Sequence, residues 1–306
     1  AEDGGPGGED GGTDGAQSGG EPAPGRGGGD GGGMSAGAWA DDMPHHIYVV
    51  HWAGAPARRR MLDAMLGRLG YPAANVTVMS WCDRRTVSNE TLARYTDFSV
   101  GCLERRAVAV PPRERAEVAR RHAGRPDVAL RHLAGSKASF GAAHVCNAVS
   151  HHDALADMVR RGHRSALVLE DDTLLARGFF QLLPAFVRQL DPDWGVLVLD
   201  AAVSEDIWST FPDLGPRRPV PTVYRRSEPL FYGSGALFWS HDAARSVAST
   251  MLPFCLPGDL EFRYHFMVHL VSVFFVSPGL AVQRSLLDAK NWGDEFVTST
   301  LDEERH

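Results

Sequence analysis

The sequence predicts an α/β fold built on a parallel β-sheet, and three observations support this class. Residues 45–52 form a short β-branched and aromatic run, residues 58–69 carry apolar side chains at helical spacing, and residues 76–81 form a second strand-like run. A strand, a helix and a strand in this order indicate a βαβ unit. The continuous apolar runs at 165–169 and 194–199 are typical of buried strands, and an acidic residue follows each of them.

The other elements are predicted from local start and stop signals. The first helix stops before Gly70 and Pro72. A helix over residues 141–160 has one apolar face and ends at Gly162. The proline-rich region 203–229 predicts a loop. We further expect helices at 178–189 and 242–251 and strands at 230–240 and 271–276.

Composition separates a tail, residues 1–43, from a domain, residues 44–306. The tail holds 17 of the 33 glycines and carries nine acids against the single base Arg26, a net charge of −8. Such a segment buries too little apolar surface to offset the entropy of ordering, so we expect it to be disordered. The whole chain carries −7, which leaves +1 for the domain. Near-neutral charge argues against nucleic-acid binding by phosphate neutralisation.

Targeting and redox signals leave the compartment open. No run of 18 uncharged apolar residues occurs, and the nearest, 265–282, is better explained as buried core than as a membrane span. No signal peptide is visible, but the chain begins with Ala. Four scattered cysteines without a CxxC pair predict neither a disulfide scaffold nor a structural zinc site. The protein is expected in the secretory pathway if it is eukaryotic and a targeting segment is missing, and in the cytoplasm otherwise.

The triplet Glu170-Asp171-Asp172 is the sharpest chemical feature of the sequence, because three acids directly follow an apolar strand. Mutual repulsion and desolvation make such a cluster unfavourable unless a cation lies on it. Mn²⁺ or Mg²⁺ would suit it, since both prefer oxygen ligands and leave room for substrate phosphates. Ligands of open α/β sheets bind at the carboxyl ends of strands. The alternative is a solvated turn whose acids cap the next helix.

Several motifs together resemble glycosyltransferase family 25, which includes bacterial lipooligosaccharide galactosyltransferases and procollagen galactosyltransferases. The resemblance spans about residues 46–290. It is carried by Ile47-Tyr48-Val49-Val50 with Pro56 and Arg58-Arg59, by Ser150-His151, by Ala166-Leu167-Val168-Leu169-Glu170-Asp171-Asp172, by Asp193-Trp194-Gly195-Val196-Leu197-Val198-Leu199, and by Gly233-Ser234-Gly235-Ala236-Leu237-Phe238-Trp239-Ser240.

The resemblance implies a GT-A-like (Rossmann-like) fold with a mixed, mostly parallel sheet flanked by helices, in one domain over residues 44–306. It also implies a metal-dependent glycosyltransferase. Such an enzyme would move a hexose, galactose in the first instance, from a UDP-linked or other nucleotide sugar to a glycan or protein hydroxyl, with inversion. The inferred partners are the nucleotide sugar and a glycan or glycoprotein acceptor.

Roles for individual residues follow from the resemblance. By analogy with the DxD element of the GT-A fold, Glu170 and Asp172 would engage Mn²⁺ or Mg²⁺, since residues two apart on a strand share a face. His265, one helical turn from His269, is a candidate third ligand or a core histidine. Asp259 is the candidate general base, or a turn residue. The candidate donor-binding residues are Arg58, Arg59, Ser150, His151, Glu170, Asp171, Gly233 and Gly235.

Departures from the family pattern support a rival hypothesis. The family's Glu corresponds to His144, its Gly-Cys to Cys146-Asn147, and its Asn-Leu to His51-Trp52. A non-catalytic glycan- or partner-binding protein on the same fold is therefore the alternative function. A phosphoryl-transfer or receiver-like domain ranks last, because such domains are shorter and need a lysine after a later strand, where only Lys290 is available.

Overall fold

A computed structural model describes residues 42–110, 112–121, 123–125, 141–200, 222–225 and 233–284. The predicted disordered tail, apart from its last two residues, lies outside the described residues. Most of the predicted proline-rich loop also lies outside them. Part of that loop, Thr222–Arg225, is a strand, so the prediction of a continuous loop over 203–229 was wrong there.

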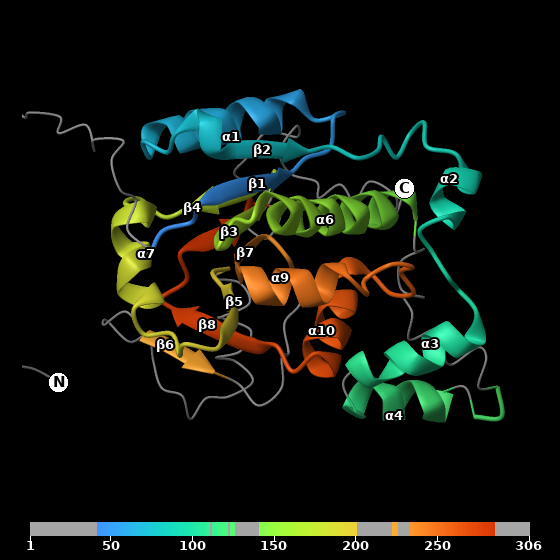
Figure 1. Cartoon of the computed structure of the whole chain (residues 1–306). Helices are drawn as coiled ribbons and strands as arrows, with labels where there is room; N and C mark the ends of the chain where they lie inside the picture. Colours follow the sequence, from blue (N-terminus) through green and yellow to red (C-terminus); the bar gives the residue numbers. More distant parts are fainter. Residues whose placement is uncertain are drawn as a thin grey trace, which may run out of the picture. The chain divides into compact units, whose positions relative to one another are not determined.

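Seven strands form one mixed sheet in the order β2-β1-β3-β7-β5-β8-β6 (Figure 1). Five strands share one direction, whereas β7 and β6 run against their neighbours. The predicted α/β fold with a mixed, mostly parallel sheet is therefore confirmed. The strands are β1 (His46–Val50), β2 (Val76–Met79), β3 (Ser165–Glu170), β5 (Trp194–Val198), β6 (Thr222–Arg225), β7 (Ala236–Ser240) and β8 (Ser272–Ser277). A separate antiparallel pair joins β4 (Thr173–Leu175) to β9 (Ala281–Gln283).

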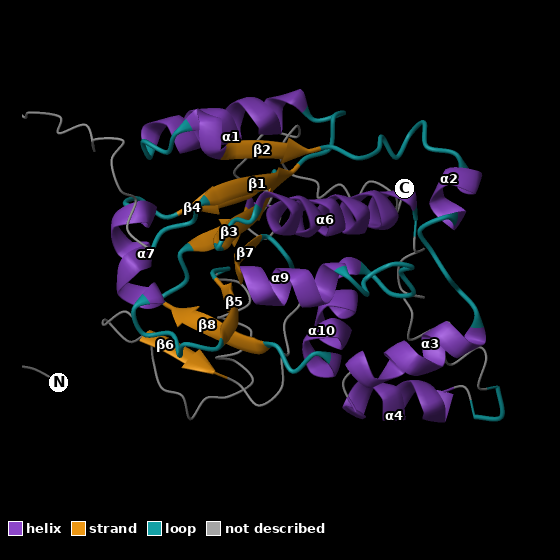
Figure 2. Ribbon diagram, viewed as in Figure 1, coloured by secondary structure: helices purple, strands orange, loops and turns teal. Residues whose placement is uncertain are grey.

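Helices cover both faces of this sheet (Figure 2). The larger ones begin and end close to the predicted positions, and α6 ends as expected at Gly162, whose φ is 69°. The structure adds α10, whose first turns the sequence did not predict as helix. The helices are α1 (Pro56–Arg68), α2 (Asn89–Ala93), α3 (Val100–Arg106), α4 (Pro112–Arg121), α6 (Ala142–Arg161), α7 (Phe179–Val187), α9 (His241–Ala248) and α10 (Gly258–Val268), with 3₁₀ turns at Ala73–Asn75 and Ala107–Ala109.

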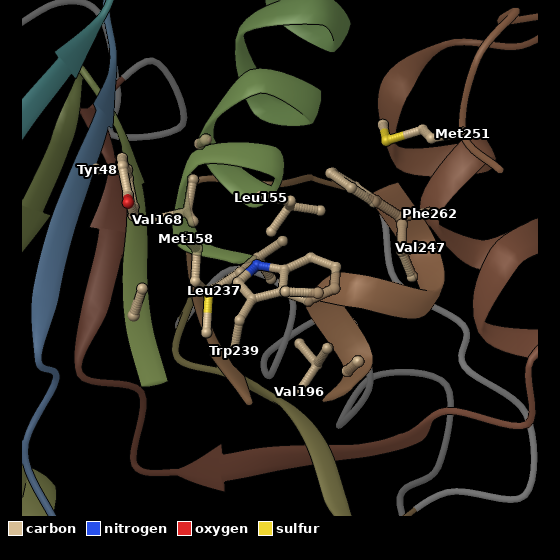
Figure 3. Close-up of a cluster of buried hydrophobic side chains, with 14 of the residues drawn as sticks. Tyr48, Leu155, Met158, Val168, Val196, Leu237, Trp239, Val247, Met251 and Phe262 are labelled. Carbon is tan, nitrogen blue, oxygen red and sulfur yellow. The ribbon is translucent and has the colours of Figure 1, made fainter. Parts of the chain in front are cut away.

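Two hydrophobic cores lie on the two faces, because successive strand side chains point to opposite sides. In β1, Tyr48 packs in the core beneath α6, α9 and α10, and Ile47 packs in the core beneath α1 and α7. Figure 3 shows the first of these cores around the fully buried Trp239. Burial on both faces explains why the strands appear in the sequence as continuous apolar runs.

All four cysteines are paired, as Cys82–Cys146 and Cys102–Cys255. The sequence did not predict these bridges, because the partners lie 64 and 153 residues apart. Structural disulfides persist in oxidising compartments. Among the described helices, none combines the length and apolar content needed to cross a membrane.

The stability of the fold is expected to fall between pH 6.5 and 4 because of His46. This buried ring stacks on His163 at 4.7 Å and contacts Thr77 Oγ1 at 2.7 Å. Burial, followed by the nearby positive charge of His163 and Arg161, lowers the pKa of His46 from 6.5 to about 4. Below pH 6.5 the unfolded chain therefore binds a proton that the folded chain rejects, so the contribution of His46 to stability is lost as the pH falls.

Urea unfolding at pH 7 and pH 4.5 measures this loss. After allowance for solvent screening, we expect His46 to account for about 1 kcal/mol of the decrease in unfolding free energy. Between pH 7 and pH 4.5 the unfolding free energy of His46→Gln should therefore decrease by about that much less than the unfolding free energy of the wild type. Equal losses in both proteins would contradict the assignment.

Candidate active site

The candidate site lies at one edge of the sheet, where three strands bring polar groups together. Glu170 ends β3, and Asp200 follows β5 at the same edge. Strand β7 is antiparallel to both, so its amino end, preceded by Gly233 and Gly235, meets them there. The Glu170 N–H donates to the Gly235 carbonyl at 3.0 Å. This is the edge at which open α/β sheets bind ligands.

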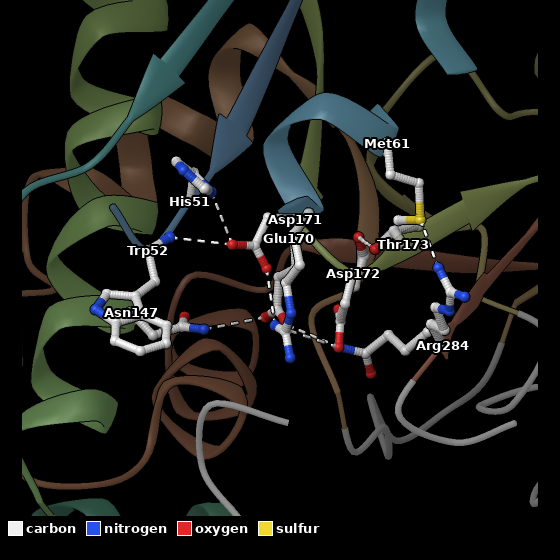
Figure 4. A network of polar contacts seen from close by, with 12 residues as sticks. His51, Trp52, Met61, Asn147, Glu170, Asp171, Asp172, Thr173 and Arg284 are labelled. Atoms are coloured by element: carbon white, nitrogen blue, oxygen red, sulfur yellow. Dashed lines mark hydrogen bonds and ion pairs between the residues drawn. The ribbon is translucent and has the colours of Figure 1, made fainter. Parts of the chain in front are cut away.

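Glu170 is the centre of a hydrogen-bond network that joins α6, the segment before β7, and β9 (Figure 4). Its Oε1 contacts Asn147 Nδ2 at 3.3 Å, His151 Nε2 at 3.3 Å and Ser234 Oγ at 2.5 Å, and its Oε2 accepts from Gln283 Nε2 at 2.7 Å. Burial alone would raise the pKa of Glu170, but these contacts with His151, Ser234 and Asn147 outweigh burial and hold the pKa below its usual value. Glu170 is therefore ionised and held by protein donors.

Asp171 is buried, with 7 % of its side chain exposed, and its carboxylate contacts other groups of the protein. It accepts from Arg58 Nη1 at 3.0 Å and from the Trp52 N–H at 3.1 Å, and it lies 2.8 Å from His51 Nδ1. Figure 4 shows His51 and Trp52 converging on it. Asp171 and Arg58 neutralise each other beneath the surface, and their predicted contact with the donor stays a prediction. Together they tie the start of α1 to the end of β3.

The contacts of Asp172 and Arg59 also indicate structural roles. Asp172 Oδ2 lies 3.9 Å from Arg58 Nη1, and the Asp172 carbonyl accepts from the Arg284 N–H at 2.9 Å. Arg59 pairs with Asp63 one turn along α1, with 38 % of its side chain exposed. Arg59 is therefore a surface residue of α1, and the structure does not place it with the carboxylates of the sheet edge.

The three residues predicted for a metal ion are not brought together. The carboxylate of Glu170 already accepts four hydrogen bonds, and Asp172 lies beside a guanidinium. His265 is buried on α10, with Nδ1 3.1 Å from Thr250 Oγ1 and Nε2 3.5 Å from Glu261. Across the part of the chain that the structure describes, no group of three His, Cys, Asp or Glu could hold a metal ion. The predicted ligand set therefore does not fit a metal ion.

Asp259 lies in the first turn of α10 and faces the start of β7. Its Oδ2 accepts from the Gly233 N–H at 3.4 Å, and its Oδ1 accepts from the Leu260 N–H at 2.9 Å. Burial raises the pKa of Asp259 above 3.8, the charge of Glu170 adds to the rise, and the two backbone hydrogen bonds oppose it. A carboxylate whose pKa is raised binds a proton more strongly, which suits a general base.

The two glycines before β7 have different reasons to be glycine. Gly233 has a φ of 109°, which favours glycine. A Cβ on Gly235 would lie 2.4 Å from Gln283 Cγ and 2.8 Å from Asp200 Oδ2. Other groups therefore approach the backbone closely at Gly235. Both glycines precede the strand, whereas the sequence predicted them inside it.

Replacing Gly235 with Ala should disturb the site and lower the unfolding free energy by about 1–3 kcal/mol, because the added methyl overlaps the side chains of Gln283 and the buried Asp200. The matched control is Gly67→Ala in α1, where a Cβ would meet nothing within 4 Å. That change should stabilise the protein by about 0.5–1 kcal/mol. Urea unfolding of both variants measures the contrast. A neutral Gly235→Ala would contradict the close approach.

Two predicted residues of α6 have different roles, and the structure adds two residues that the sequence analysis did not assign to the site. Ser150 donates to the Cys146 carbonyl at 2.9 Å within α6, so it is part of the scaffold, whereas the predicted His151 reaches Glu170. Sequence reasoning assigned no role to Asp200 and Gln283. Asp200 follows an apolar strand, as Glu170 does, and this repeated pattern was the available signal. For Gln283 we find no comparable signal.

Comparisons with known proteins do not identify the family. No family model and no curated protein matches the chain. Among solved structures, mouse xyloside xylosyltransferase 1 in its apo form matches with 13 % sequence identity over 76 % of this chain and 84 % of that chain, at a TM-score of 0.33. A likeness at this TM-score carries no argument about function.

Proposed function

We propose that this protein is a glycosyltransferase that transfers a hexose, galactose in the first instance, from a nucleotide diphosphate sugar to a hydroxyl of a glycan or protein. The observation that carries the proposal is the meeting of Glu170, Asp200 and Asp259 around the glycine-rich start of β7, at the edge where α/β sheets bind ligands. The paired cysteines favour an acceptor in an oxidising compartment.

In the proposed reaction the acceptor oxygen attacks the anomeric carbon while the bond from that carbon to the diphosphate oxygen breaks. The diphosphate leaves with the bonding electron pair, and the acceptor proton passes to the carboxylate of Asp259. One general base is sufficient for such an inverting displacement. Glu170, which is ionised and keeps 16 % of its side chain exposed, is suited to accept a hydrogen bond from a sugar hydroxyl rather than to take up a proton.

A non-catalytic glycan- or partner-binding protein is the second candidate function. The observation that favours it is that protein donors already bind two acids of the triplet, with Arg58 and His51 on Asp171 and four donors on Glu170. A site of this kind could bind a sugar through hydrogen bonds without performing transfer.

A screen of UDP- and GDP-sugars for hydrolysis or transfer separates the two functions. It should be run with Mn²⁺, with Mg²⁺ and with EDTA, since the requirement for a metal stays a prediction. We expect release of one nucleotide diphosphate with one donor class. Binding of a free glycan without turnover of any donor would support the second function instead.

A further inference from the structure

The Cys82–Cys146 disulfide joins two segments that border the candidate site. Cys82 lies in the loop that follows β2, and Cys146 lies in the first half of α6. The next residue on α6, Asn147, donates to Glu170, and one turn further His151 contacts the same carboxylate. The bridge therefore fixes the loop after β2 to the helix that holds the central carboxylate.

The loop after Cys82 in turn holds the ring of Trp52. Asp83 Oδ1 accepts from Trp52 Nε1 at 3.2 Å and from the Arg85 N–H at 2.9 Å. The guanidinium carbons of Arg84 and Arg85 lie 4.3 and 4.7 Å from the centroid of the Trp52 ring, a cation–π arrangement. The backbone N–H of Trp52 donates to Asp171. A continuous chain of contacts therefore runs from the disulfide through the loop and the indole to Asp171.

Trp52 is also packed closely against Gly54. A Cβ on Gly54 would lie 2.3 Å from the indole ring, so the glycine backbone rests directly against it. The ring remains partly exposed, unlike the buried Asp171 beside it. It follows strand β1 at the carboxyl edge of the sheet. Trp52, Arg84 and Arg85 therefore present an aromatic and cationic surface next to the carboxylates, which is complementary to a nucleoside diphosphate.

We infer that the Cys82–Cys146 disulfide is a positioning element for the donor, and this inference rests on the proposed function. The loop is a turn without regular secondary structure, so the cross-link restricts the conformations available to Asp83, Arg84 and Arg85. Without it, these side chains must be ordered when the donor binds, which weakens binding. The other disulfide, Cys102–Cys255, joins α3 to the segment before α10 and contacts neither Trp52 nor its loop.

The test compares Cys82→Ser/Cys146→Ser with the matched control Cys102→Ser/Cys255→Ser. Calorimetric titration with UDP should give a Kd about tenfold higher for the first variant and within about twofold of the wild type for the control. Trypsin cleavage after Arg84 and Arg85 should accelerate in the first variant alone. In Asp83→Ala, which keeps both disulfides, the loss of the Trp52 contact should also weaken UDP binding.

The outcomes separate this inference from the proposed function. An unchanged UDP affinity in both Cys82→Ser/Cys146→Ser and Asp83→Ala would overturn the positioning role. Equal acceleration of trypsin cleavage in the two disulfide variants would also overturn it. If the wild type binds no UDP and turns over no nucleotide sugar, the proposed function fails, and the donor role fails with it. The trypsin comparison then still decides whether this disulfide holds the loop. If the disulfide variant does not fold, Asp83→Ala decides the question.

Discussion

Replacing Asp259 with Asn is expected to lower the rate of sugar transfer by about 10²–10⁴-fold, the usual contribution of a general base. The amide cannot accept the acceptor proton, but its oxygen can still accept from Leu260 or Gly233, so the start of α10 should keep its conformation. The affinity for the donor should change little, because the base acts on the acceptor. Steady-state kinetics and donor titration on the same preparation measure both effects.

The pH dependence of transfer gives a second readout of the same group. As the pH falls, Asp259 becomes protonated and the rate of transfer should decline. Because burial raises the pKa of Asp259 above 3.8, the midpoint of this decline should lie at a pH above 3.8. The control is Asp242→Asn, an exposed acid that pairs with Arg245 on α9 and should leave the rate unchanged. A fully active Asp259→Asn enzyme would remove Asp259 from the mechanism.

Replacing Glu261 with Ala is expected to reduce the unfolding free energy by about 3–5 kcal/mol, the largest stability effect predicted for the chain. Glu261 is fully buried and accepts from Arg106 Nε at 2.9 Å and from the Cys255 and Leu256 N–H groups at 2.5 and 2.8 Å. Its removal leaves the guanidinium of Arg106 buried without its carboxylate. Urea unfolding monitored by circular dichroism measures the loss.

An exposed ion pair provides the matched control for this buried one. Glu90 in α2 and Arg94 at its C-terminal end are one turn apart, with 82 % and 70 % of their side chains exposed. Replacing Glu90 with Ala should cost no more than about 0.5 kcal/mol. A loss below about 1 kcal/mol for Glu261→Ala would show that the buried pair does not hold α3 against α10.

The central strands could be predicted from the sequence because they depend on local patterns. The apolar runs at 165–169 and 194–199 are buried on both faces, and the acids that follow them lie at one edge. The identity of the partners could not be predicted. Arg58 lies 113 residues from Asp171, and nothing local distinguishes an acid that a guanidinium neutralises from one that faces a ligand.

The partners of His265 could not be predicted for a similar reason. Its spacing from His269 is that of metal ligands, but the ring of His265 points to Thr250 and Glu261, within and beside its own helix. Gln283 was missed because its contact with Glu170 depends on the pairing of β9 with β4, two three-residue strands that are too short to show a periodic pattern.

The central claim is that the edge of the sheet around Glu170 binds a nucleotide sugar, and calorimetric titration of UDP-galactose tests it most directly. The wild type should show saturable binding at one site. Glu170→Ala, confirmed as folded by circular dichroism, should bind at least about tenfold more weakly, because four donors lose the carboxylate that orients them. Equal binding by both proteins, or no heat of binding to the wild type with any UDP- or GDP-sugar, would contradict the claim.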